Sequence, residues 1–117
     1  MTDLLVVSGF ADHDALDRFV RAEIRYFRSR DMRAWRCESD GPELRLAFGD
    51  GPDLAALAAA LSAAHPALAL AWSREERGGA ATRVFRGGAA GPRAQAGASL
   101  EELAARGRVL EEIYGTF

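Results

Sequence analysis

The sequence contains no lysine and no asparagine, and all fifteen of its basic residues are arginine. A single cysteine, Cys37, excludes a disulfide within the chain. The sequence has no apolar run near the roughly 18 residues that a membrane-spanning helix needs. Its first residues also lack the basic segment and long apolar run of a secretory signal. We therefore expect a cytoplasmic protein.

What the sequence does contain is enough apolar material for one core. The 117 residues fit a single domain, and hydrophobic residues make up 49% of them. Charged residues make up 27%, so the surface is well solvated. The net charge of −2 produces no overall field that would attract polyanions.

The first half of the chain alternates between strand-like and helix-like patterns. Leu4–Phe10 is apolar at consecutive positions, which predicts a strand covered on both faces. Asp12 or Asp14 can cap the helix that follows, whose apolar residues recur at three- and four-residue spacing. Residues 33–38 and 43–48 each alternate around a turn signal, and this predicts a β-hairpin.

The second half begins with a helix that Asp50 or Gly51 can cap and that has Pro52 at its first position, and His65-Pro66 should stop it. A strand over residues 67–74 and a short strand over 82–86 follow. A capping box at Ser99-Leu100-Glu101-Glu102 then predicts a last helix.

The resulting order, β-α-β-β-α-β, predicts an α+β domain with a ferredoxin-like split βαβ sheet, an extra short strand and a C-terminal helix. We expect the ferredoxin-like domain to occupy residues 1–88 and a Gly/Ala/Pro-rich loop to occupy 89–98. The helix at 99–117 should pack on the same domain or on a partner. Either this helix or a second copy of the protein should cover the sheet face that the other helices leave open.

The second half also resembles the ferredoxin-like domain of short phage- and plasmid-borne proteins of unknown function. In those proteins a helix ends at a His-Pro or Tyr-Pro step, and an alternating strand leads through glycines into a short strand ending in Gly. The matching text here is Leu54–Pro66, Leu68–Glu76, Gly78-Gly79 and Arg83–Gly87, within residues 50–88. The resemblance implies a mobile-element context and transfers no catalytic residue.

Residues able to carry catalysis or bind a metal are few. Neither His13 nor His65 has the set of neighbouring ligands that a metal site requires. Cys37 shares a strand face with Trp35, which favours a buried thiol over a nucleophile. The adjacent Glu pairs point apart and form no acid/base dyad by themselves. We therefore expect no cofactor, no metal and no enzymatic activity.

The strongest polar feature is a run of seven arginines within nineteen residues of the first half. Such a run can bind an anionic partner, or it can be a solvated face balanced by nearby carboxylates. The candidate partner-binding residues are Arg18, Arg21, Arg25, Arg28, Arg33 and Arg36.

Three functions remain open from the sequence. The first is a non-catalytic protein-binding module, such as a phage or mobile-element inhibitor or accessory factor that acts on a host protein complex. The second is a nucleic-acid-binding domain that uses the arginine-lined first helix. The third is a small enzyme on a dimeric ferredoxin-like scaffold, with a pocket near Arg36, Cys37 and Trp35. A protein partner is expected, and a homodimer is compatible with the pattern.

Overall fold

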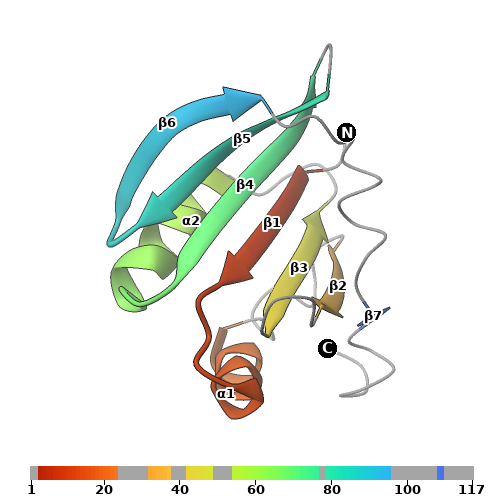
Figure 1. Cartoon of the computed structure of the whole chain (residues 1–117), viewed down its shortest axis with the longest axis vertical. Coiled ribbons are helices and arrows are strands. Elements are labelled where there is room, and N and C mark those ends of the chain that lie inside the picture. The colour runs from red at the N-terminus through yellow and green to blue at the C-terminus, as the bar shows by residue number, and fades with distance from the viewer. Residues whose placement is uncertain are drawn as a thin grey trace.

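The computed structural model describes residues 3–23, 32–37, 42–48, 54–76, 79–95 and 108–109, and Figure 1 shows their arrangement. These residues form an α+β fold. In chain order its elements are β1 (Asp3–Ser8), α1 (His13–Glu23), β2 (Met32–Cys37), β3 (Glu43–Phe48), α2 (Leu54–Ala64), β4 (Ala69–Glu76), β5 (Gly79–Arg86), β6 (Ala89–Gln95) and β7 (Arg108–Val109).

All described strands belong to one sheet, in the order β6-β5-β4-β1-β3-β2-β7, and every neighbouring pair is antiparallel. The strand β1 lies between β3 and β4, so Leu5 has Leu46 as its partner on one side and Trp72 on the other. The predicted hairpin of the first half is confirmed, because β2 and β3 pair along their whole length.

Local sequence explains where α1 begins and where α2 ends. Asp12 accepts a hydrogen bond from the backbone N–H of Ala15 at 2.8 Å, so Asp12, and not Asp14, caps α1. The predicted stop of the second helix is confirmed, because α2 ends at Ala64 and the N–H of His65 donates to the carbonyl of Leu61 at 2.9 Å. Its expected cap and its proline at residues 50–52 lie outside the described residues.

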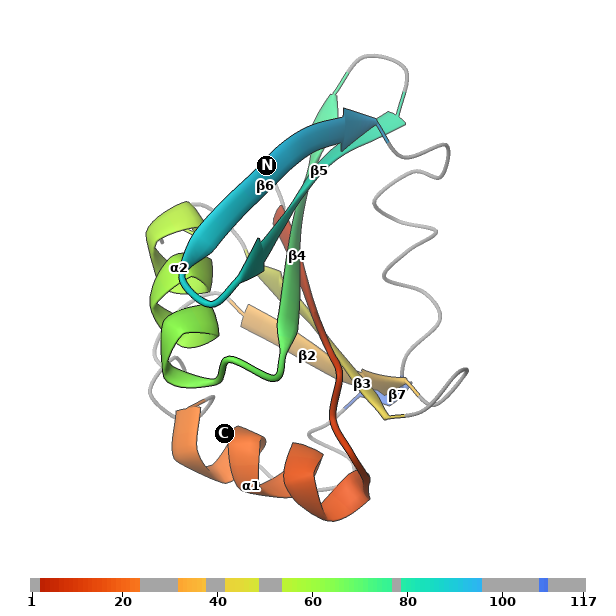
Figure 2. The ribbon, with the colours of Figure 1, turned by 60° about the vertical axis from the view of Figure 1, so that its left-hand side comes forward.

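The core forms where both helices pack against one face of the sheet. Leu5 of β1, Phe48 of β3 and Leu70 of β4 are fully buried on this face, and Leu16 of α1 and Leu54 of α2 are buried against them. Figure 2 shows both helices on this side of the sheet, with α2 beside β4, β5 and β6. Each large side chain buried in this way contributes about 1.5–3 kcal/mol.

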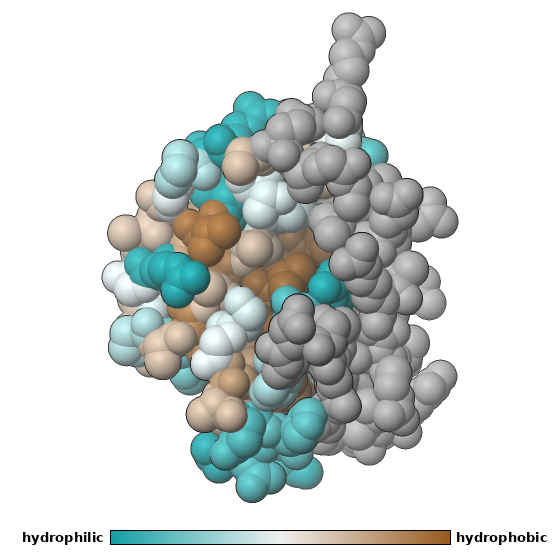
Figure 3. Space-filling model, viewed as in Figure 1, coloured by the Kyte–Doolittle hydropathy of each residue, from teal (hydrophilic) through white to brown (hydrophobic). Residues whose placement is uncertain are grey.

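The opposite face of the sheet is also covered over β1. Leu4 points away from the helices, because neighbouring side chains on a strand alternate, and yet it is fully buried. The predicted coverage of this strand on both faces is therefore confirmed. Ser73 and Thr82 lie on the same face and share a hydrogen bond of 2.7 Å between their hydroxyls. In Figure 3, which views this face, apolar residues gather near its centre.

The sequence prediction of a loop at residues 89–98 is wrong for residues 89–95. These residues form β6, which pairs with β5 across a turn at Gly87-Gly88. The two glycines have φ angles of 56° and 85°. A two-residue turn with both φ angles positive matches the right-handed twist of a hairpin, so the glycines join two strands. The strand before the turn is longer than predicted and begins at Gly79.

The prediction of a C-terminal helix over residues 99–117 is wrong at Arg108–Val109. These two residues form the short strand β7 and pair with Trp35 and Arg36 of β2. An interstrand pair requires an extended backbone, which a helix cannot supply. The other residues of that segment lie outside the described residues.

We expect Gly88→Ala to destabilise the protein by about 1 kcal/mol more than Gly87→Ala. Both substitutions place an L-residue at a positive φ. A Cβ at position 88 would lie 3.2 Å from the Cβ of Ala63 in α2, whereas one at position 87 would meet nothing within 4 Å. Urea denaturation of the two variants measures the difference, and equal stabilities would contradict the packing of this turn on α2.

Candidate functional site

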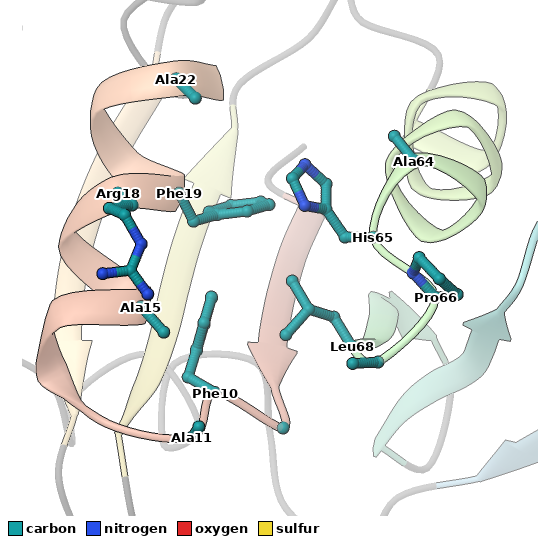
Figure 4. A pocket seen from close by; sticks show the side chains of 12 residues that line it. Phe10, Ala11, Ala15, Arg18, Phe19, Ala22, Ala64, His65, Pro66 and Leu68 are labelled. Carbon is teal, nitrogen blue, oxygen red and sulfur yellow. The ribbon is translucent and has the colours of Figure 1, made fainter.

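A groove of about 510 Å³ separates α1 from the segment that joins α2 to β4. Figure 4 shows Phe10 and Phe19 on one side of the groove and Pro66 and Leu68 on the other. Apolar side chains supply most of its lining, and small alanines of both helices leave it open. A cavity of this shape and composition is typical of a binding site.

An aromatic cluster forms the floor of the groove. The rings of Phe10 and Phe19 meet edge to face with centroids 5.4 Å apart, and the ring of His65 meets Phe19 in the same way at 5.1 Å. His65 Nε2 lies 3.1 Å from a carboxylate oxygen of Glu23, the last residue of α1. This contact ties the end of α1 to the end of α2, so the groove has a defined width.

Among the described residues, the charged groups at the groove are Arg18, which lines it from α1, and the pair formed by Glu23 and His65. No described lining residue is a serine, threonine or cysteine that could act as a nucleophile. The Glu23–His65 pair is about 70% buried on both sides and serves as a bridge between helices. The geometry therefore favours binding of an apolar group that carries a negative charge nearby.

The structure describes the side chains of only two of the six candidate partner-binding arginines. Arg18 and Arg21 lie exposed on α1, as the helical spacing predicts. Arg33 and Arg36 belong to β2, and their side chains lie outside the described residues, as do Arg25 and Arg28 entirely. The six candidate positions are therefore distributed over a helix and a strand, and a common surface for them stays a prediction.

A second polar cluster joins β1 to β4 at the far end of the sheet. Asp3 is 8% exposed, and its carboxylate accepts two hydrogen bonds from Arg74, at 3.0 Å from Nε and 2.8 Å from Nη2. The indole N–H of Trp72 donates to the same carboxylate at 3.2 Å. The guanidinium of Arg74 also lies over the Trp72 ring, 5.1 Å from its centroid. This carboxylate therefore fixes both side chains.

The sequence marks His65 as a helix terminator and gives it no set of metal ligands, but its pairing with Glu23 and the cluster of Asp3, Trp72 and Arg74 were not predicted. A signal for the cluster was available, because Trp72 and Arg74 are two residues apart on a predicted strand and so share a face. Their pairing with Asp3 depends on the register of β4 against β1, which local patterns do not reveal. No local signal brings His65 next to Glu23, 42 residues earlier in the chain.

Within the described residues, no three side chains of His, Cys, Asp or Glu come together as metal ligands. The helices of the described part are all too short or too polar to cross a bilayer. Comparison with known proteins gives no match: no family model, no curated protein and no solved structure is similar to this chain. The resemblance of residues 50–88 to phage- and plasmid-borne domains stays a prediction.

We expect Asp3→Ala to lower the free energy of unfolding by about 1–3 kcal/mol, because it removes the acceptor of the Trp72 and Arg74 hydrogen bonds. Asp14→Ala removes an exposed carboxylate from α1 and is the matched control, with a much smaller expected effect. Urea denaturation measures both variants. A loss for Asp14→Ala as large as that for Asp3→Ala would show that charge alone, and not this cluster, matters.

Proposed function

We propose that this chain is a small, non-catalytic protein-binding module, and that the groove between α1 and the α2–β4 connection is its binding site. The observation that carries the proposal is an open groove whose floor is formed by the largely buried rings of Phe10 and Phe19, beside the exposed, cationic Arg18. The partner is a protein segment that presents an aromatic or aliphatic side chain with a carboxylate next to it.

Two features support a binding role for this groove. Aromatic side chains and arginine are the residues that interface hot spots use most often, and here Phe19 and Arg18 stand side by side on α1. The contact between Glu23 and His65 spans the groove's end, so the groove needs little rearrangement to receive a ligand. Less of the binding energy is then lost to ordering the site.

We further propose that the central part of the sheet, with the two helices, has a ferredoxin-like split βαβ architecture. The order β1-α1-β2-β3-α2-β4 and the arrangement β4-β1-β3-β2 of its strands support this assignment. The strands β5, β6 and β7 extend the sheet at its two edges, which sets it apart from a simple four-stranded sheet. We also propose a role as an inhibitor or accessory factor of a host protein complex, which fits a groove whose described lining holds no catalytic nucleophile.

Anilinonaphthalene sulfonate, an aromatic anion, is a suitable probe of the groove because it combines the two chemical features of the proposed partner. We expect the native protein to bind it with enhanced fluorescence. Ala22→Glu and Ala64→Glu place a carboxylate at the groove from α1 and from α2 respectively, and each should weaken binding about tenfold or more.

The matched control is Ala60→Glu, which adds the same carboxylate at an exposed position of α2 that does not line the groove. This variant should bind the probe as the native protein does. Thermal unfolding midpoints close to that of the native protein establish that the variants are folded. Equal binding by all three variants, or no binding by the folded native protein, contradicts a recognition site in the groove.

A further inference from the structure

Three arginines gather on one face of the sheet, far from the groove. Arg74 of β4, Arg83 of β5 and Arg93 of β6 line a hollow of about 240 Å³ together with Trp72. Figure 2 shows that β4, β5 and the arrowhead end of β6 extend above α2. Arg83 and Arg93 are both exposed, and about half of the Arg74 side chain is exposed.

The register of the strands places these charges next to one another. Arg83 and Arg93 are direct partners in the β5–β6 pair, and Arg83 is also the partner of Trp72 in the β4–β5 pair. Like charges directly opposite one another on two strands destabilise the sheet. Two guanidinium groups side by side at the edge of one hollow can, however, both contact the same anion.

The contacts of Arg74 fix its side chain at the hollow before any ligand binds. Two hydrogen bonds to Asp3 and the contact with the Trp72 ring hold its guanidinium in one orientation. An arginine fixed in this way loses little conformational entropy when it binds a ligand. Asp3 occupies the Nε and Nη2 atoms of Arg74, so the exposed guanidinium groups of Arg83 and Arg93 supply the main contacts with an oxyanion. Phosphate offers them more acceptor oxygens and more charge than a carboxylate.

From this geometry we propose that Arg74, Arg83 and Arg93 form a binding site for a phosphate group. The ligand is a phosphate of a nucleotide or of a single-stranded nucleic acid, and Trp72 stands at the edge of the hollow beside it. The site is distinct from the arginines of α1. Its residues lie level with Asp3 and Leu5 in the first half of β1, whereas Arg18 belongs to the helix that follows the other end of this strand.

The test uses the full-length protein and three probes: a fluorescein-labelled single-stranded oligodeoxythymidine, AMP and inorganic phosphate. We expect the oligonucleotide to bind in fluorescence anisotropy, and AMP or phosphate to compete with it. The double variant Arg83→Gln/Arg93→Gln should weaken oligonucleotide binding about tenfold or more. The slope of log affinity against log salt should fall by about 1.4, because each phosphate contact on a single strand contributes roughly 0.7.

The matched control is Arg18→Gln/Arg21→Gln, which removes the same charge from exposed positions of α1. We expect this control to keep its affinity. Competition by AMP and phosphate supports a site for the phosphate group itself. Binding of the oligonucleotide without such competition supports a site that contacts successive phosphates of a nucleic-acid strand.

Two outcomes would overturn the proposal. One is the absence of binding by all three probes at low salt. The other is an equal or larger loss of affinity in the α1 control, which would move the nucleic-acid contact to the first helix.

A stability measurement separates loss of binding from loss of folding. Arg83→Gln removes one of two directly opposed positive charges, so its thermal unfolding midpoint should equal or exceed that of the native protein. A variant that remains folded and still binds the probes like the native protein would exclude Arg83 from the site.

Discussion

The burial of β1 is the constraint on which the rest of this structure depends. Leu4 and Leu5 point to opposite faces of the sheet, and neither is exposed to solvent. The backbone of the strand is paired on both edges, with β3 and with β4. Every other described element is therefore placed relative to this strand: the helices over its Leu5 face, and the two wings of the sheet on its two sides.

The two ends of β1 also separate the two surfaces for which we infer a role. The chain leaves the strand at Gly9 and Phe10, which line the apolar groove beside α1. Asp3, at the other end, holds Arg74 and Trp72 and so fixes the edge of the arginine-lined hollow. A strand of six residues is about 20 Å long, so two ligands can occupy these places without touching. The two proposals are therefore independent of each other.

The strand β6 lies at one edge of the described sheet, and two of its features discourage pairing with a further strand. Pro92 lacks the N–H that a further strand would require, and the register shift between Arg83 and Phe85 bends the pairing with β5. Both features discourage association with another chain. They leave Arg93 exposed on the edge, opposite Arg83, where an anion can reach both.

The sequence by itself determined the order of the described elements up to residue 86, the end of helix α2 and the β2–β3 hairpin, because hydrophobic periodicity and turn residues are local properties. It also held one signal for β6, a Gly-Gly pair that can form a hairpin turn, but the Ala, Gly and Pro residues of β6 itself have the composition of a linker. Only the tertiary structure decided which distant side chains meet. The contacts of His65 with Glu23, of Asp3 with Arg74 and of Arg83 with Arg93 arise from helix placement and strand register. Those are set by packing of the whole core and not by any short segment.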